Sequence, residues 1–313
     1  MVNFLKNKAF KEISIIIFLG ILYLLLVHDS LDNNMRKQES KLENEIKKEA
    51  GEKEPFKENV HFILNETGDT IEKRYNPPEG FERIPVGEDS FAFYLRNHKL
   101  KAYGEKALYY HGKEKNPQGI YDSVFDVEIG DRDLHQCADA IMLLRAEYLY
   151  QQKRYDEISF DFTNGFKADY QNWLEGHRIK INGNHVTWVK EASYDDSYSN
   201  FRKYMDLFFS YAGTLSLEKQ LMSVNMEDMQ IGDVFIQGGS PGHAVIVVDM
   251  AENKASGEKV FMLAQSYMPA QQTQILINPL DKDISPWYRL DSLEESLITP
   301  EWVFKRTDLK RFP

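Results

Sequence analysis

Apolar side chains recur every three or four residues in two long stretches of the chain, and this spacing predicts two helices. The stronger pattern covers residues 131–150, and the second covers residues 198–211. The apolar face of the first is formed by five side chains: Leu134, Cys137, Ile141, Leu144 and Tyr148. A shorter helix is expected at residues 167–174.

Runs of apolar, β-branched and aromatic residues bounded by turn residues predict strands. The expected strands are residues 91–95, 107–110, 124–129, 158–162, 234–237, 243–250 and 260–266. Asn164-Gly165 and Gly232-Asp233 read as turns, and residues 238–242 as a glycine-rich loop. Because the last strands follow the helices without alternating with them, the expected fold class is α+β with an antiparallel sheet.

The first thirty residues have a different pattern, with lysines before an uninterrupted apolar run at residues 13–27. This run is long for a signal peptide and short for a membrane span, since it reaches roughly 22 Å as a helix. We expect an uncleaved signal anchor at residues 1–28, with the lysines in the cytoplasm and the rest of the chain outside.

Residues 29–59 are densely charged and poor in aromatics, so they predict a stalk that cannot bury a core. From residue 60 to residue 313 the chain is rich in aromatic and alternating patterns, which indicates a single globular domain. The expected location is therefore extracytoplasmic, with the domain tethered to a membrane.

Composition narrows the function further. The formal net charge is -11, with 38 Lys+Arg against 49 Asp+Glu, so a basic surface for nucleic acid is not expected. Cys137 is the only cysteine, which excludes an internal disulfide and a cysteine-rich zinc site. The sequence carries none of the sought metal or nucleotide motifs, and we expect no cofactor.

Cys137 and His243 are the candidate nucleophile and base. Near the start of a helix, free backbone N–H groups and the helix dipole favour a thiolate, and we expect a lowered thiol pKa. His243 opens a strand directly after the glycine-rich loop. His135 and His111 are weaker candidates for the base. A lone cysteine on an apolar helix face is also commonly a small buried hydrophobe, and that alternative stays open.

The hairpin after His243 predicts a third member. If Asp249 pairs with Val260, the register brings His243 opposite Ser266, whereas a shift of one residue brings Gln265 there. A polar side chain that can orient the imidazole is expected in either register.

Five further polar or aromatic residues are candidates for substrate binding. Gln136 lies beside the cysteine, where its amide could help to hold an oxyanion, although a solvated glutamine at a helix start is the simpler interpretation. The others gather in a short polar and aromatic segment: Asn164, Tyr170, Trp173 and Arg178. Such groups suit a cleft for a peptide, but turn and core roles are the alternative.

A cysteine at a helix start, a histidine at a strand start and a polar residue on the next strand form an order that resembles papain-like cysteine hydrolases. Gly232-Asp233-Val234 and Gly242-His243-Ala244-Val245 are similar to the strands around the histidine of NlpC-type and CHAP-type peptidases and amidases. This resemblance covers residues 131–267 and implies cleavage of bacterial cell-wall peptides. The sequence around the cysteine, His135 to Ala140, departs from that of these families.

Almost the whole globular part also resembles an uncharacterised domain of unknown function from bacterial envelope proteins. Its hallmark segments are residues 136–139, 162–166, 241–245 and 264–270. Two hypotheses follow. The first is a membrane-anchored thiol hydrolase of papain-like fold that acts on a cell-wall peptide or similar ligand. The second is a non-catalytic binding module that keeps the scaffold.

Overall fold

The computed structural model describes residues 64–293 and 295–313, which lie within one compact unit of the chain. The expected membrane anchor (1–28) and stalk (29–59) lie outside the described residues. In the part of the chain that is described, no helix has the length and apolar character needed to cross a bilayer.

The helices are α2 (Ile71–Arg74), α3 (Phe91–Arg96), α4 (Cys137–Gln151), α5 (Tyr170–Leu174), α6 (Tyr198–Phe209) and α7 (Thr214–Gln220). The strands of the large sheet are β1 (Glu82–Arg83), β2 (Tyr121–Val124), β7 (Met222–Ser223), β8 (Val234–Gln237), β9 (His243–Glu252), β10 (Lys259–Gln265), β11 (Gln274–Leu276), β12 (Trp287–Arg289) and β15 (Leu309–Arg311). Three smaller hairpins are β3 (Ser159–Asp161) with β4 (Lys167–Asp169), β5 (His177–Asn182) with β6 (His185–Lys190), and β13 (Ser296–Ile298) with β14 (Val303–Lys305).

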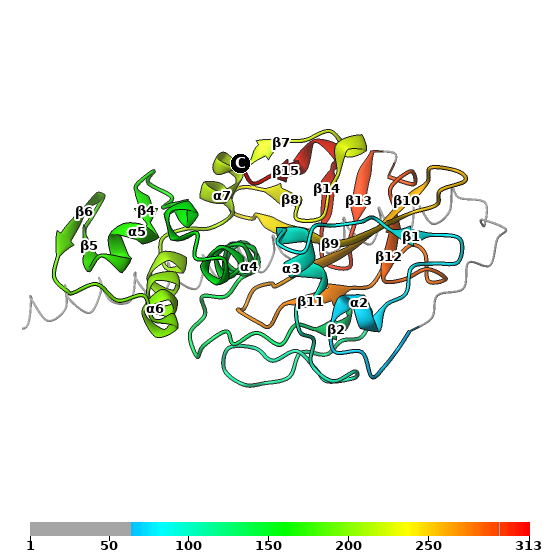
Figure 1. The fold of residues 1–313 in the computed structure, drawn as a ribbon, viewed down its shortest axis with the longest axis horizontal. Coiled ribbons are helices and arrows are strands. Elements are labelled where there is room, and N and C mark those ends of the chain that lie inside the picture. The colour runs from blue at the N-terminus through cyan, green and yellow to red at the C-terminus, as the bar shows by residue number, and fades with distance from the viewer. Residues whose placement is uncertain (1–63, 294) are drawn as a thin grey trace, which may run out of the picture. The chain divides into compact units, whose positions relative to one another are not determined.

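The large sheet has the strand order β2-β11-β10-β9-β8-β15-β7, with β1 beside β9 and β12 beside β10. The pairings are antiparallel. Together with the helices this is an α+β fold with a large antiparallel sheet, as the sequence predicted. In Figure 1, α5, α6, β5 and β6 lie on one side of α4 and the sheet on the other.

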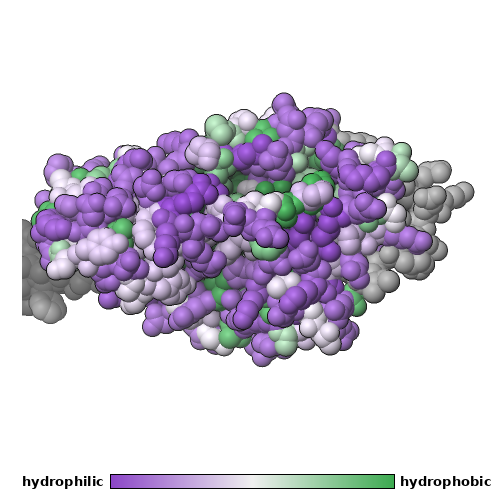
Figure 2. Space-filling model, in the orientation of Figure 1, coloured by the Kyte–Doolittle hydropathy of each residue, from purple (hydrophilic) through white to green (hydrophobic). Residues whose placement is uncertain are grey.

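The two faces of β9 pack against different partners, because successive side chains of a strand point in opposite directions. Ala244, Ile246 and Val248 share a core with α4, whose residues are buried along most of its length. Val245 and Val247 belong to a second core, which also contains Phe304 of β14. A helix that is apolar on nearly all sides is buried in this way. The surface in Figure 2 is mostly hydrophilic, with hydrophobic residues gathered in a hollow over the sheet.

Four predicted elements differ from the structure. The strand expected at residues 107–110 is present only as isolated bridges of Leu108 and Tyr109, and only Val124 of the strand expected at residues 124–129 lies in a strand, β2. Residues 91–95, expected as a strand, form α3, because Ser90 accepts a hydrogen bond from the backbone N–H of Phe93 and caps a helix. A short apolar run without periodicity does not distinguish the two. Residues 167–169, expected as helix, pair with β3 before α5 begins.

Candidate active site

Cys137 is the first residue of α4. Gln136 occupies the N-cap position, and its backbone N–H donates a hydrogen bond to Oδ2 of Asp139 at 3.1 Å. This bond closes the first turn of the helix onto the preceding chain. Cys137 is 7% exposed, so its sulfur lies just below the surface at the end of the helix.

The surroundings of the sulfur oppose its ionisation. Burial raises the pKa of the Cys137 thiol to about 12, and the carboxyl of Asp139 also raises it. The nearby backbone N–H groups of Ala138, Ala244 and Cys137 itself favour the thiolate and lower the pKa, but their effect is smaller. The prediction that the helix start lowers this pKa is therefore wrong. At neutral pH the thiol is protonated, and it needs a base to become a nucleophile.

His243 is the first residue of β9 and pairs with Gln237 of β8. Its ring is 1% exposed and lies among three aromatic rings: Tyr267 at 4.7 Å, Trp302 at 5.3 Å and Phe304 at 5.9 Å between centroids. Burial lowers the pKa of His243 to about 4, and the charge of Lys115 adds to this effect. At neutral pH the imidazole is therefore neutral, and its burial makes it a weaker base than an exposed imidazole.

The structure decides which polar residue faces His243. The register pairs Val260 with Ala251 and Ala264 with Ile246, and a bulge between Met262 and Leu263 shifts the pairing. This differs from the expected pairing of Asp249 with Val260. Gln265 lies beside the imidazole, with its Oε1 2.8 Å from Nε2 of His243.

Ser266 points to the other face of the sheet, because it follows Gln265 directly in an extended chain. Its Oγ lies 2.8 Å from the carbonyl oxygen of His135 and 2.7 Å from that of Gln271. Ser266 thus contacts the segment that leads into the Cys137 helix, and it does not orient His243.

Cys137 and His243, which the sequence places far apart, come to the same end of β9. The link is Ala244, which follows His243 directly and whose backbone N–H lies near enough to the sulfur of Cys137 to lower its pKa. Within the described residues, no hydrogen bond joins the sulfur itself to the imidazole of His243. The arrangement therefore supplies a thiol and a neutral imidazole at one strand end.

Two residues of this region were missed by the sequence analysis. Nε2 of Gln265 donates to Oε2 of Glu301 at 2.6 Å, and Nζ of Lys115 lies 2.8 Å from the same oxygen. Lys115 is only 4% exposed, which is unusual for a lysine and marks it as paired. No local pattern connects residues 115, 265 and 301, so the sequence held no signal for this pairing.

Gln136 does not direct its amide at the sulfur. Its Nε2 donates to Oδ1 of Asp133 at 3.1 Å, and the same oxygen accepts the backbone N–H of Ala270 at 2.6 Å. Gln136 therefore joins two loops at the helix start.

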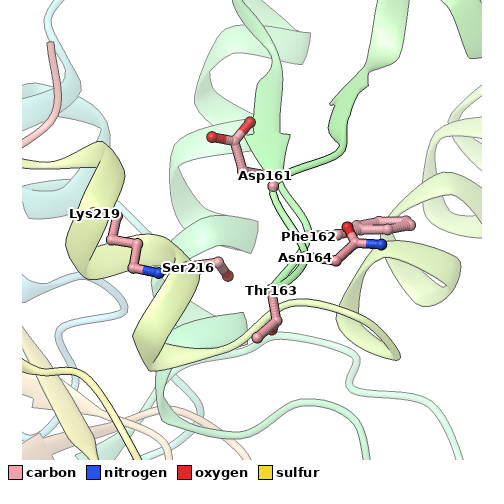
Figure 3. Close-up of a pocket in the computed structure, with 7 residues that line it drawn as sticks. Asp161, Phe162, Thr163, Asn164, Ser216 and Lys219 are labelled. Atoms are coloured by element: carbon pink, nitrogen blue, oxygen red, sulfur yellow. The ribbon is translucent and has the colours of Figure 1, made fainter. Parts of the chain in front are cut away.

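Asn164 lies at a pocket of about 170 Å³ between the turn after β3 and helix α7. Figure 3 shows Asp161, Phe162, Thr163 and Asn164 along one wall, with Ser216 and Lys219 of α7 on the other. Asn164 accepts the backbone N–H of Phe166 at 3.0 Å through its Oδ1, which closes the turn.

The remaining substrate-binding candidates pack together in the lobe of α5, β5 and α6. Tyr170 is 0% exposed, and Nε1 of Trp173 donates to Oδ1 of Asn200 at 2.9 Å. The guanidinium of Arg178 stacks on the Trp173 ring at 4.3 Å and donates to the Trp173 carbonyl. Because these groups bond to one another and to the backbone, they form core and do not wall a cleft in this structure.

A second pocket, of about 540 Å³, lies beside the segment that leads into α4. Its lining includes Tyr109, Tyr110, Glu128, Asp131 and Gln272. In the described part of the chain, no group of three or more His, Cys, Asp or Glu residues is arranged to hold a metal ion.

Buried His135 makes a prediction about pH. Burial, with a smaller contribution from Arg202, lowers its pKa to about 3, and its Nδ1 has no hydrogen-bond partner. The unfolded chain binds a proton near pH 6.5 and the folded chain does not, so folding loses free energy as the pH falls from about 6.5 towards 3. This contribution is fully present above pH 6.5.

The variant His135→Gln removes that proton uptake. We expect the slope of unfolding free energy against pH, measured by urea denaturation between pH 6 and 4, to be smaller in the variant by about 1.4 kcal/mol per pH unit. Other titrating groups are common to both proteins and cancel in the difference. Equal slopes would contradict a buried neutral His135.

Comparisons with known proteins identify a family but no activity. A family model described as a domain of unknown function (4846) matches residues 71–311. No curated protein and no solved structure matches the chain significantly.

Proposed function

Because the chain belongs to the family of the domain of unknown function (4846), whose description assigns no activity, we propose its function from the geometry around Cys137. We propose that the protein is a thiol hydrolase of papain-like fold, related to the NlpC-type and CHAP-type enzymes. It would cleave an amide or peptide bond, in cell-wall peptides as the preferred substrate class.

The observation that carries this proposal is the meeting of two strand and helix ends. The backbone N–H of Ala244, the residue next to His243, lies near enough to the sulfur of Cys137 to lower its pKa, and His243 in turn is held by Gln265. A nucleophile, a base and a group that orients the base are the parts that covalent catalysis by a thiol requires.

The proposed reaction begins with both partners neutral. Nδ1 of His243 takes the thiol proton as the sulfur attacks the carbonyl carbon, which forms a C–S bond and a tetrahedral oxyanion. Backbone N–H groups at the start of α4 would stabilise that oxyanion. The C–N bond then breaks, the imidazolium returns its proton to the leaving amine, and water hydrolyses the thioester with His243 again as the base.

The proposed location follows from the apolar run at residues 13–27, which lies outside the described residues. Lysines before this run and acids after it support an anchor that leaves the catalytic domain outside the cytoplasm. A substrate in the cell envelope would be within reach of a domain held in this way.

The test uses the reactivity of Cys137, which is the only cysteine of the chain. We expect His243→Ala to slow alkylation of Cys137 by iodoacetamide at pH 7 by about 10²-fold, the size of a general-base contribution. The rate of the variant should rise only at high pH, where the thiol ionises without help. The control is His111→Ala, which removes an exposed histidine and should leave the rate unchanged.

A different result would favour the second candidate, a non-catalytic binding module of the cell envelope. The observation in its favour is burial, since Cys137 and His243 are both largely closed to solvent. If alkylation has the same rate and pH profile in His243→Ala as in the unchanged protein, the two residues do not act together and the hydrolase proposal is refuted.

A further inference from the structure

A chain of buried hydrogen bonds leads away from the imidazole of His243. It runs from Nε2 of His243 to Oε1 of Gln265 at 2.8 Å, and from Nε2 of Gln265 to Oε2 of Glu301 at 2.6 Å. It ends at Nζ of Lys115, 2.8 Å from the same carboxylate oxygen. We propose that Glu301 and Lys115 are positioning residues, which fix the orientation of the Gln265 amide and through it the proton of His243 on Nε2.

The orientation of Gln265 follows from the chemistry of its neighbour. A glutamine amide has a donor end, NH₂, and an acceptor end, the oxygen, and it can turn over at little intrinsic cost. A carboxylate accepts only, and Oε2 of Glu301 lies 2.8 Å from the ammonium of Lys115, a second donor. The NH₂ end of Gln265 must therefore face Glu301, which leaves the oxygen facing His243.

The proton of His243 follows in the same way. An amide oxygen only accepts, so Nε2 of His243 must be the nitrogen that carries hydrogen. A neutral imidazole has one N–H, and Nδ1 is then left with the free lone pair. With the amide turned over, Nε2 would be the acceptor and Nδ1 would carry the proton, and the ring could not take a proton through Nδ1.

The ion pair also explains why the residue that orients His243 is an amide and not an acid. A lone carboxylate against Nε2 would favour the charged imidazolium. Here the negative charge of Glu301 lies one residue further away and is balanced by Lys115. The network therefore supplies direction without adding net charge beside the ring.

Aromatic rings keep water from competing with these bonds. Tyr267 lies between the two ends of the network, with its ring 4.7 Å from that of His243 and 5.9 Å from Nζ of Lys115. The ring of Trp302, the neighbour of Glu301, packs against His243, and its Nε1 donates to Gln237 at 3.0 Å. Hydrogen bonds in such a dry environment are stronger than exposed ones.

The catalytic meaning of this network rests on the proposed function, but its effect on His243 can be measured without any substrate. In protein labelled with ¹⁵N-histidine, the ring nitrogen shifts of His243, assigned with the variant His243→Gln, report which nitrogen carries hydrogen. We expect the unchanged protein to show only the Nε2–H form at pH 7. In Glu301→Gln either end of the new amide can face Gln265, so we expect a mixture with the Nδ1–H form.

Alkylation of Cys137 by iodoacetamide should fall in proportion to the lost Nε2–H form, about twofold if the two forms become equal. The matched control is Glu191→Gln, which breaks an exposed ion pair with Lys180 (2.7 Å) of the same residue types and should change neither readout. Should Glu301→Gln fail to fold because Lys115 is left unpaired, the double variant Glu301→Gln, Lys115→Met removes both charges and carries the same expectation.

Two results would overturn the inference. One is a His243 ring that stays wholly in the Nε2–H form in both variants, since Gln265 would then be oriented without Glu301. The other is a changed ring with unchanged alkylation, which would leave Glu301 and Lys115 without a positioning role. Failure of the proposed function is distinguishable, because it shows as alkylation that ignores His243→Ala whatever form the ring has.

Discussion

Replacing Asp249 with alanine is expected to cost about 3–5 kcal/mol of unfolding free energy, the usual effect of removing one partner of a buried ion pair. Asp249 lies in the middle of β9 and is 0% exposed. Its Oδ2 lies 2.8 Å from Nε of Arg83, and its Oδ1 lies 2.7 Å from Nε of Arg96. Without the carboxylate, two largely buried guanidinium groups face each other with no counter-charge.

The effect should be large because this cluster joins three elements of the chain. Arg83 belongs to β1, Arg96 to α3 and Asp249 to the central strand β9. Urea denaturation of the purified protein measures the loss, and Asp69→Ala, which removes an exposed ion pair with Lys73, serves as the control with little expected change. A loss below about 1 kcal/mol for Asp249→Ala would contradict a tightly paired, dry cluster.

The second large effect concerns chemistry. If Cys137 is the nucleophile, Cys137→Ala should lower the rate of amide hydrolysis in cell-wall peptide fragments by about 10⁴–10⁶-fold, as loss of the nucleophile does in other hydrolases. Mass spectrometry of the released fragments measures this rate. The substitution removes only the sulfur from a helix that is otherwise unchanged, so the folded state should persist.

Circular dichroism and the urea midpoint are the controls for folding in this variant. The variant Cys137→Ser is a second check, because a hydroxyl is a poorer nucleophile than a thiol and should also lose most of the activity. Hydrolysis that persists at the original rate in Cys137→Ala would remove the sulfur from the mechanism. The non-catalytic module would then be the better reading.

Local patterns predicted much of the secondary structure around the candidate site. The strand expected at residues 234–237 is β8 with the same bounds, and the expected strands at 243–250 and 260–266 differ from β9 and β10 by two residues or fewer at each end. The start of α6 was likewise predicted correctly at Tyr198. These signals are strong because apolar periodicity and turn residues act within a few positions of one another.

The pairing of those strands was not predictable in the same way. The bulge between Met262 and Leu263 changes which polar side chain reaches His243, and one residue of slip exchanges Gln265 for Ser266. Sequence alone left both possible. Register depends on how the side chains of several strands fill the two cores, which is a property of the assembled sheet.

The sequence by itself determined the strands β8, β9 and β10 and the start of α6, the α+β class and the residues with chemical capacity, Cys137 and His243 among them. The tertiary structure decided their neighbours and their protonation. It buried the thiol, so that desolvation outweighs the backbone N–H groups at the helix start, and it brought Glu301 and Lys115 to Gln265. Burial and hydrogen-bond partners come from segments distant in the chain, and no local pattern encodes them.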